Sequence, residues 1–334
     1  MIQTTKLSAL ALASLAAAYA PMGGFLPRAL VSVDASGSEA QPQGAQPQGA
    51  QPQGAGQEEA GPPLPPQEPV GARPSDPAAD RAKLIAAFQE MGIILADDAD
   101  ALGFSARVEV LNELLEYLLT TPQGASHESM FLTDVSPDGL TAAMLALGVG
   151  QGDNVQYVAK DPPPTREEAR NGVPTHEVIV PSGGETYLYA AWRESSGARD
   201  ATTGEFPGET LHFHRMEDLL LDLVRGRTMR RHPWVWLGSR MVQDRGNGGG
   251  EVLAAASTGN LVNVAFFSQG DTLVTAALPE CTVQTGWRPN VWLLPDRGAE
   301  ILFIMSTDEL DGLPDGLRAA APFVPEPVGD SGGR

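Results

Sequence analysis

The chain has 334 residues and a formal net charge of −20. So acidic a composition argues against binding to nucleic acid or to an anionic membrane, because both are polyanions that need a positive protein surface. The one cysteine, Cys281, excludes an internal disulfide and a multi-thiolate metal or iron–sulfur centre within the chain. We expect Cys281 to be a small buried residue and expect no cofactor.

The first 35 residues predict export. One positive charge, Lys6, precedes the uncharged run LSALALASLAAAYA, and Ala18-Tyr19-Ala20 has the small residues of a signal-peptidase site. Because Pro21 follows directly, cleavage near Ala20 and cleavage further on, near Ala35, both stay open. The run is too short to cross a bilayer, and Pro21, Gly23 and Gly24 break it, so a retained membrane anchor is the weaker alternative. We therefore expect a periplasmic or secreted mature chain without a transmembrane span.

Residues 36–75 predict a disordered linker. The pentapeptide AQPQG occurs three times between Ala40 and Gly54, and PPLPP follows at Pro62–Pro66. A segment made of Gln, Pro, Gly and Ala has too few apolar side chains to form a core, so its backbone stays extended and solvated.

An amphipathic helix is predicted over residues 76–91, where Leu84, Ile85, Phe88 and Met91 recur at spacings of three and four. Residues 92–110 then predict a hairpin. From residue 92 to 306 we expect one β-rich α+β domain, with many short, mainly antiparallel strands and two to four helices. Residues 307–334 predict a loose tail.

The middle of the chain has its clearest signals after residue 128. Ser129–Val135 predicts a strand, and Ser136, Pro137 and Gly148 are the cap, first residue and stop of a helix over residues 136–148. Before it, ELLEYLLTT over residues 113–121 alternates as a strand does, although Asn112 could cap a helix there; the alternation favours the strand.

Later elements are short. We predict a polar loop over residues 160–172, a helix over Arg215–Val224, and strands at Val155–Val158, Glu177–Val180, Thr186–Trp192, Trp234–Leu237, Val252–Ala256, Leu261–Phe267 and Ile301–Met305. Trp192, Trp287 and Trp292 are expected to be packing residues rather than a carbohydrate platform.

Four segments resemble the YdjY domain family of exported bacterial proteins over residues 92–306. They are LLEYLLTTPQGASHESMFLTDVSP at Leu114–Pro137, LALG at Leu145–Gly148, WVWLGS at Trp234–Ser239 and EILFIM at Glu300–Met305. Members of the family carry Gly-Lys-x-His-Glu-Ser in the first segment, where this chain has Ala125 in place of the lysine. The resemblance implies no known biochemical activity, and although some members are described as ferredoxin-like, one cysteine cannot hold a cluster.

The turn Gly124–Ser129 holds the candidate catalytic residues His127, Glu128 and Ser129. A base, an orienting carboxylate and a nucleophile are present, but neighbours in a strand point to opposite faces and cannot form a relay. His127 and Ser129 would share a face that Glu128 opposes. The favoured interpretation is that His127 and Glu128 stabilise the turn by bonding backbone amides.

Two other groups are candidates for ligand binding. His212 and His214 would lie on one face of a strand, a spacing used for metals, yet two histidines without a defined third ligand make a metal site unlikely. Glu209, Glu217 or Asp218 could supply that ligand. Arg227, Arg230 and Arg231, with Arg225 and His232, form a basic cluster. This cluster either binds an anion or acidic partner, or complements the negative end of the predicted helix before it.

The sequence therefore favours an exported domain of unknown activity that binds an envelope protein or component, or a small ligand. The alternative is a hydrolase or metal-dependent enzyme that uses His127 and Glu128 together with His212 and His214. Convergence of those side chains in one cleft would favour the enzyme.

Overall fold

The computed structural model describes residues 77–97, 100–196, 202, 208–244 and 249–324. The expected signal region and linker lie outside the described residues, so both stay predictions. From Ala78 on, the described residues belong to one compact unit. None of the helices described is both long and apolar enough to cross a lipid bilayer.

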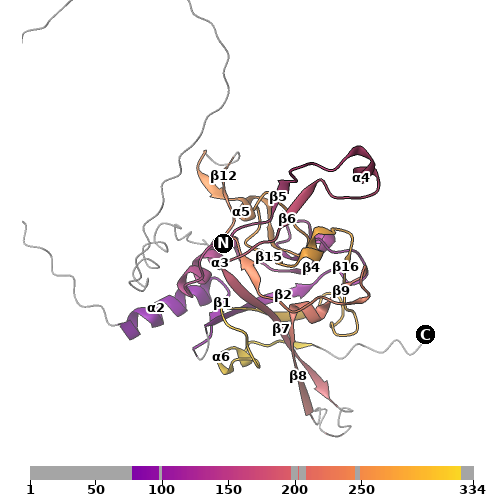
Figure 1. Cartoon of the computed structure of the whole chain (residues 1–334). Coiled ribbons are helices and arrows are strands. Elements are labelled where there is room, and N and C mark those ends of the chain that lie inside the picture. The colour runs from indigo at the N-terminus through magenta and orange to yellow at the C-terminus, as the bar shows by residue number, and fades with distance from the viewer. Residues whose placement is uncertain (1–76, 98–99, 197–201, 203–207, 245–248, 325–334) are drawn as a thin grey trace, which may run out of the picture. The chain divides into compact units, whose positions relative to one another are not determined.

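Eight strands form a closed, mixed sheet in this unit (Figure 1). In order around it they are β2 (Ala101–Val108), β17 (Glu300–Ser306), β7 (Glu185–Ser196), β11 (Trp234–Trp236), β15 (Val274–Thr275), β14 (Asn260–Asn263), β3 (Tyr117–Thr120) and β4 (Ser129–Leu132), which pairs back with β2. The pairs β3–β4 and β14–β15 are parallel and the others around the closed sheet are antiparallel. This confirms a β-rich α+β domain with mainly antiparallel strands.

The other strands lie outside the closed sheet. β1 (Ile93–Leu95) pairs with β2, whereas β8 (Gly208–Arg215) and β18 (Phe323–Val324) pair with β7. Three small sheets are formed by β10 (Arg227–Thr228), β9 (Leu220–Asp222) and β16 (Trp287–Pro289), by β12 (Met241–Gln243) and β13 (Glu251–Leu253), and by β5 (Gln156–Ala159) and β6 (His176–Ile179).

The helices are short. The described residues hold five α-helices, rather than two to four, and three 3₁₀ turns: α2 (Pro77–Glu90), α3 (Pro137–Ala146), α4 (Arg166–Arg170), α5 (Ala254–Thr258), α6 (Asp315–Arg318), η2 (Ser126–Glu128), η3 (Met216–Leu219) and η4 (Pro279–Thr282). The two best-signalled helices are confirmed. Ser136 caps α3 by accepting a hydrogen bond from the Gly139 amide, and α2 buries Phe88 in the main core.

The closed sheet buries side chains on both faces of its strands. Successive residues of β17 point alternately into the main core and into a second, smaller core: Ile301, Phe303 and Met305 against Leu302 and Ile304. In the main core, Phe303 stacks on Phe104 with ring centroids 5.2 Å apart and meets Phe131 edge-on at 6.1 Å. Three strands therefore share one aromatic contact in the interior.

The second core corrects the prediction of a loose tail over residues 307–334. Leu313, Leu317 and Ala321 are buried in this second core. β18 pairs in parallel with β7, where Phe323 lies beside Arg193. The chain up to Val324 is therefore part of the folded unit. Pro, Gly and Asp in this stretch form turns between buried residues, a pattern that composition alone does not distinguish from a loose tail.

The prediction of a helix over Arg215–Val224 is wrong. Arg215 ends β8, Met216–Leu219 form the single turn η3, and Leu220 begins β9. Of the leucines at helical spacing, Leu219 is buried in η3 and Leu220 at the start of β9, whereas Leu223 is exposed. A short apolar run fits both periods, and the tertiary contacts decide between them.

Three other predictions need correction. The polar loop over residues 160–172 contains α4, with a capping box in which Thr165 and Glu168 exchange hydrogen bonds. The strand predicted at Val252–Ala256 ends at Leu253, where α5 begins. The strand predicted over residues 113–121 is present, but it begins only at Tyr117 and lies parallel to β4.

Candidate functional site

The turn between β3 and β4 carries the three catalytic candidates. Ser126–Glu128 form η2, whose position is set from outside the turn: the Ala125 amide donates to Asn260 Oδ1 at 2.9 Å. Gly124 packs so closely on the backbone of Gly259 that an added Cβ would lie 2.6 Å from the Gly259 carbonyl oxygen. Gly259 itself has a φ of +78° and ends α5, a conformation that favours glycine.

This geometry corrects the expected role of His127 and Glu128 in holding the turn. The His127 side chain is 78% exposed, and its Nε2 atom lies 3.6 Å from Glu128 Oε1. The backbone bonds within the turn are instead made by main-chain groups, for example the Glu128 amide to the Ala125 carbonyl. His127 is therefore free to contact a ligand and contributes little to the turn.

Ser129 cannot act with His127 as a nucleophile in this conformation. It is fully buried in β4, and its hydroxyl donates to the Phe131 carbonyl at 2.9 Å. The predicted shared face of His127 and Ser129 is not formed, because His127 lies in η2 rather than in the strand.

A cavity of about 430 Å³ opens beside the turn. It is lined by Glu109, Val110, Leu111, Asn112, Glu113, Ser126, His127 and Arg297. In its wall, Arg297 Nη2 donates to Glu109 Oε1 at 2.5 Å. The cavity thus combines one ion pair and one exposed imidazole with two apolar residues, Val110 and Leu111. Neither His212 nor His214 lines it.

Next to the turn, Glu116 and Glu128 form a carboxyl pair. Their main chains are joined by a hydrogen bond from the Glu116 amide to the Glu128 carbonyl at 3.1 Å. Burial, followed by repulsion from Glu128 and a hydrogen bond with it, raises the pKa of Glu116. Burial also raises the pKa of the neighbouring Tyr117 to about 12. Sequence analysis missed this pair because Glu116 and Glu128 are 12 residues apart and become neighbours only when β3 and β4 pair.

His212 and His214 lie on one face of β8, as predicted, and both pack on Trp192 of β7. The ring centroids of His212 and His214 are 5.1 Å and 5.3 Å from that of Trp192. Glu194 accepts a hydrogen bond from Trp192 Nε1 at 3.2 Å and lies 3.1 Å from His212 Nε2. Among the residues that the structure describes, no three His, Cys, Asp or Glu side chains are grouped as metal ligands.

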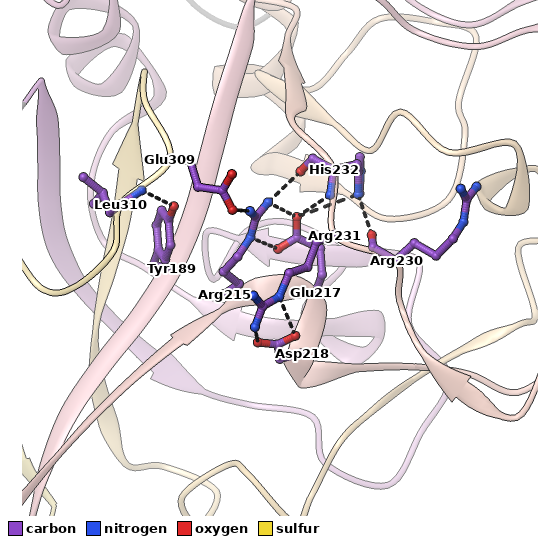
Figure 2. A network of polar contacts seen from close by, with 9 residues as sticks. All are labelled: Tyr189, Arg215, Glu217, Asp218, Arg230, Arg231, His232, Glu309 and Leu310. Carbon is purple, nitrogen blue, oxygen red and sulfur yellow. Dashed lines mark hydrogen bonds and ion pairs between the residues drawn. The ribbon is translucent and has the colours of Figure 1, made fainter.

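A buried ion-pair network lies where β8 meets η3 (Figure 2). Arg215 binds both carboxylate oxygens of Glu217, at 2.8 Å and 3.2 Å, and also donates to the His232 carbonyl and to Glu309. Glu217 is fully buried and accepts a further bond from the His232 amide. The rings of Tyr187 and Tyr189 lie 5.3 Å and 5.9 Å from the Arg215 guanidinium carbon.

Both carboxylate oxygens of Glu217 are thus used inside the fold. The network therefore joins β8, the segment before β11 and the segment around Glu309, and it offers no free carboxylate to a ligand. Sequence analysis missed it. Arg215 and Glu217 are two residues apart, on one side of an extended segment, but the stretch was interpreted as a helix. Strand periodicity would have been the only available signal.

The candidate arginines are all paired with carboxylates. Arg230 makes a bidentate contact to Glu280 at 2.7 Å and 2.8 Å, Arg227 reaches the same carboxylate at 3.3 Å, and Arg231 binds Asp218 at 2.7 Å and 3.2 Å. Hydrogen bonds from Arg230 lower the pKa of Glu280 to about 2. No helix end lies before the cluster, so the helix-dipole interpretation is wrong. An anion would have to displace these carboxylates.

An exposed aromatic residue follows β16. We call residues 290–294 the Trp292 turn. Trp292 is 88% exposed, so its predicted packing role is wrong, whereas Trp192 and Trp287 are buried as predicted. Val291 and Leu293 flank it and are also exposed. Asn290 Nδ2 donates to the Asp218 carbonyl at 3.0 Å, which attaches the turn to η3 beside the pair of Asp218 with Arg231.

Cys281 is buried, as expected, and burial raises the pKa of its thiol far above the ordinary range. The thiol is therefore not a reactive nucleophile in the folded chain.

Acid is expected to destabilise the fold through His214 and His232. Burial lowers the pKa of both histidines. For His214, the charge of His212 lowers the pKa further while Asp218 opposes this. For His232, Glu217 and a hydrogen bond with the Arg230 carbonyl oppose the effect of burial on the pKa, whereas the charges of Arg215 and Arg230 reinforce it. The neutral forms stabilise the fold above about pH 6.5, and this stability is lost as pH falls through the lowered pKa values, at up to about 1.4 kcal/mol per pH unit for each histidine.

Thermal unfolding between pH 8 and pH 5 measures this loss. The variant His232→Gln should flatten the profile, and the matched variant of an exposed histidine, His176→Gln, should leave it unchanged. Equal profiles for the parent chain and His232→Gln would contradict the prediction for His232.

No family model matches the chain, and searches of curated proteins and solved structures give no match either.

Proposed function

We propose that this chain is an exported domain that binds a protein partner or an envelope component through the Trp292 turn. The observation that carries the proposal is the exposure of Trp292 between two exposed apolar residues, next to the Asp218–Arg231 pair. Tryptophan and arginine dominate the binding energy of protein interfaces. Tryptophan is highly buried on average in folded proteins, so the exposure of Trp292 supports a surface that a partner covers.

Export rests on the signal-like residues 1–35, and residues 36–75 would serve as a spacer between the exported domain and its point of attachment or partner. The resemblance of residues 92–306 to YdjY domains supports the same assignment, since that family consists of exported proteins. The acidic net charge favours a basic or neutral partner over a polyanion.

A binding assay with a single side-chain truncation tests the proposal. The full chain is immobilised, and solubilised envelope and secreted proteins of the source organism are passed over it, with retained components identified by mass spectrometry. We expect Trp292→Ala to weaken binding of the specific component by about 30-fold, the effect of losing roughly 2 kcal/mol at an interface hot spot.

The matched control is Leu145→Ala, which removes an exposed apolar side chain from α3. This variant should retain the component as the parent does. If Trp292→Ala and the parent retain the same components equally, the Trp292 turn is not the binding surface and the proposal fails.

A second candidate function is a hydrolase that uses His127 and Glu128. The cavity of about 430 Å³ beside His127 favours it, together with the raised pKa of the adjacent Glu116. His212 and His214, which we included in this alternative, do not line that cavity and are held by Trp192 and Glu194. Hydrolysis of an ester, amide or phosphoester that His127→Ala and Glu128→Gln both abolish without lowering the melting temperature would replace the binding proposal by this one.

A further inference from the structure

A two-stranded arm, β5 with β6, extends from the closed sheet to α4 at its far end (Figure 1). No other strand of the described residues pairs with either β5 or β6. Two-stranded ribbons are marginally stable in water, and three or more strands with an apolar face are needed for independent stability. Each strand of this arm therefore has one unpaired edge.

The two faces of the arm differ. Val178 packs against the main core, so Tyr157, directly opposite it, lies on the core side. Val158 and Ile179 have the other parity and point away, and they are 44% and 47% exposed. They lie diagonally across the ribbon, since Ile179 pairs with Gln156 and Glu177 with Val158. The outer face thus carries a small apolar strip that ends at the edge of β5.

Within β5 the edge lacks the charges, prolines and bulges that protect edge strands from pairing. Its residues Gln156, Tyr157, Val158 and Ala159 include no charge and no proline, and the first charged residue after them is Lys160. Protected edges carry charges, prolines or bulges that prevent a second chain from adding a strand. β5 pairs with β6 without a register shift from Gln156–Ile179 to Ala159–His176. Its free edge is therefore a regular strand on which another strand can pair.

We propose that β5 pairs with β5 of a second copy of this chain, antiparallel across a two-fold axis, to form the four-stranded sheet β6–β5–β5–β6. A two-fold axis perpendicular to the sheet makes one residue oppose its own equivalent. Centring the axis on Val158 brings both Val158 side chains together on the outer face, flanked by Ile179 of each copy. It also places Tyr157 opposite Ala159, a large residue opposite a small one, and Gln156 opposite Lys160.

Charge favours a second copy over a foreign strand. The whole chain has a net charge of −20, which opposes self-association over most of its surface. Residues 155–180 contain three basic and four acidic residues, a net charge of −1: Lys160, Arg166, Arg170, Asp161, Glu167, Glu168 and Glu177. In the register centred on Val158, no two like charges oppose each other. A basic foreign strand would gain nothing at β5, which offers it no carboxylate.

This inference goes beyond the proposed function and shares no residue with the Trp292 turn. The paired segment, Gln156–Lys160, is only five residues long in each copy, which places the interface at the small end of specific contacts. The dimer is therefore concentration-dependent, with a dissociation constant of about 1–100 μM.

Sedimentation equilibrium of the full chain between about 1 μM and 1 mM measures the association, a range that brackets the dissociation constant given above. We expect the weight-average mass to rise from one chain toward two. The variants Val158→Lys and Val158→Glu each place like charges opposite each other across the axis and should weaken the dimer about tenfold or more. An equimolar mixture of the two variants should restore dimerisation, because opposite charges then face each other.

The matched control is Met241→Lys, which makes the same kind of change at an exposed position of β12, in another two-stranded ribbon. This variant should dimerise as the parent does. Val158 is half exposed, so its variants should fold, and unchanged circular dichroism and melting temperature check this. A chain that stays monomeric to 1 mM, or a dimer that Val158→Lys leaves intact, would overturn the proposal. A mixture of variants that fails to associate would overturn the register centred on Val158.

Discussion

Replacing Glu217 by Gln is expected to lower the free energy of unfolding by about 3–5 kcal/mol, the cost of leaving one member of a buried ion pair uncompensated. The glutamine keeps the shape of the side chain and can still accept the hydrogen bond from the His232 amide. What it removes is the negative charge that faces the Arg215 guanidinium. The remaining carboxylate, Glu309, is largely exposed, so water screens its contribution.

Urea or guanidinium unfolding, followed by circular dichroism, measures this loss. Arg231→Gln is the matched control, because it breaks the pair with Asp218 in which the Arg231 side chain is 60% exposed. This change should cost less than about 1 kcal/mol. The double variant Arg215→Met with Glu217→Gln should be more stable than Glu217→Gln alone, because no cation is then buried. Equal losses for Glu217→Gln and Arg231→Gln would show that burial does not govern the energy of this network.

Replacing Leu317 by Ala in α6 should cost about 2–5 kcal/mol, as for other fully buried leucines. Leu317 is fully buried in the second core. It packs over Gly103 of β2 so closely that a Cβ added at Gly103 would lie 3.2 Å from a Leu317 methyl group. Truncation therefore leaves a cavity between α6 and the closed sheet, which the glycine cannot fill.

Denaturant unfolding of Leu317→Ala beside Leu145→Ala separates burial from residue type. Leu145, on α3, is half exposed, and its replacement should change the free energy of unfolding by no more than about 0.5 kcal/mol. If Leu317→Ala were as stable as the parent, residues 313–324 would not be packed on the closed sheet, and the tail would be loose as its composition first indicated.

Local sequence signals were sufficient to predict those elements whose structure depends only on neighbouring residues. Ser136, Pro137 and Gly148 determine where α3 begins and ends, because a cap, a fixed φ and a positive φ act within one turn of the helix. The apolar run Ile301–Met305 of β17 likewise predicts a strand, because it is short and is bounded by Gly and Asp residues. The burial of Cys281 was likewise predicted from the residue itself, because a free cysteine behaves as a small apolar side chain.

The sequence by itself thus determined the class of this domain, its best-capped helix and the positions of most strands. The tertiary structure alone decided which strands are neighbours, and with that which side chains meet. Glu116 lies beside Glu128 because β3 pairs in parallel with β4. Arg215 is enclosed because β8 pairs with β7 and because the segment that carries Glu309 lies beside Arg215. Such contacts join residues 12 to 94 positions apart. Their free energy depends on burial and charge in the assembled core, and no local pattern of residue types contains that information.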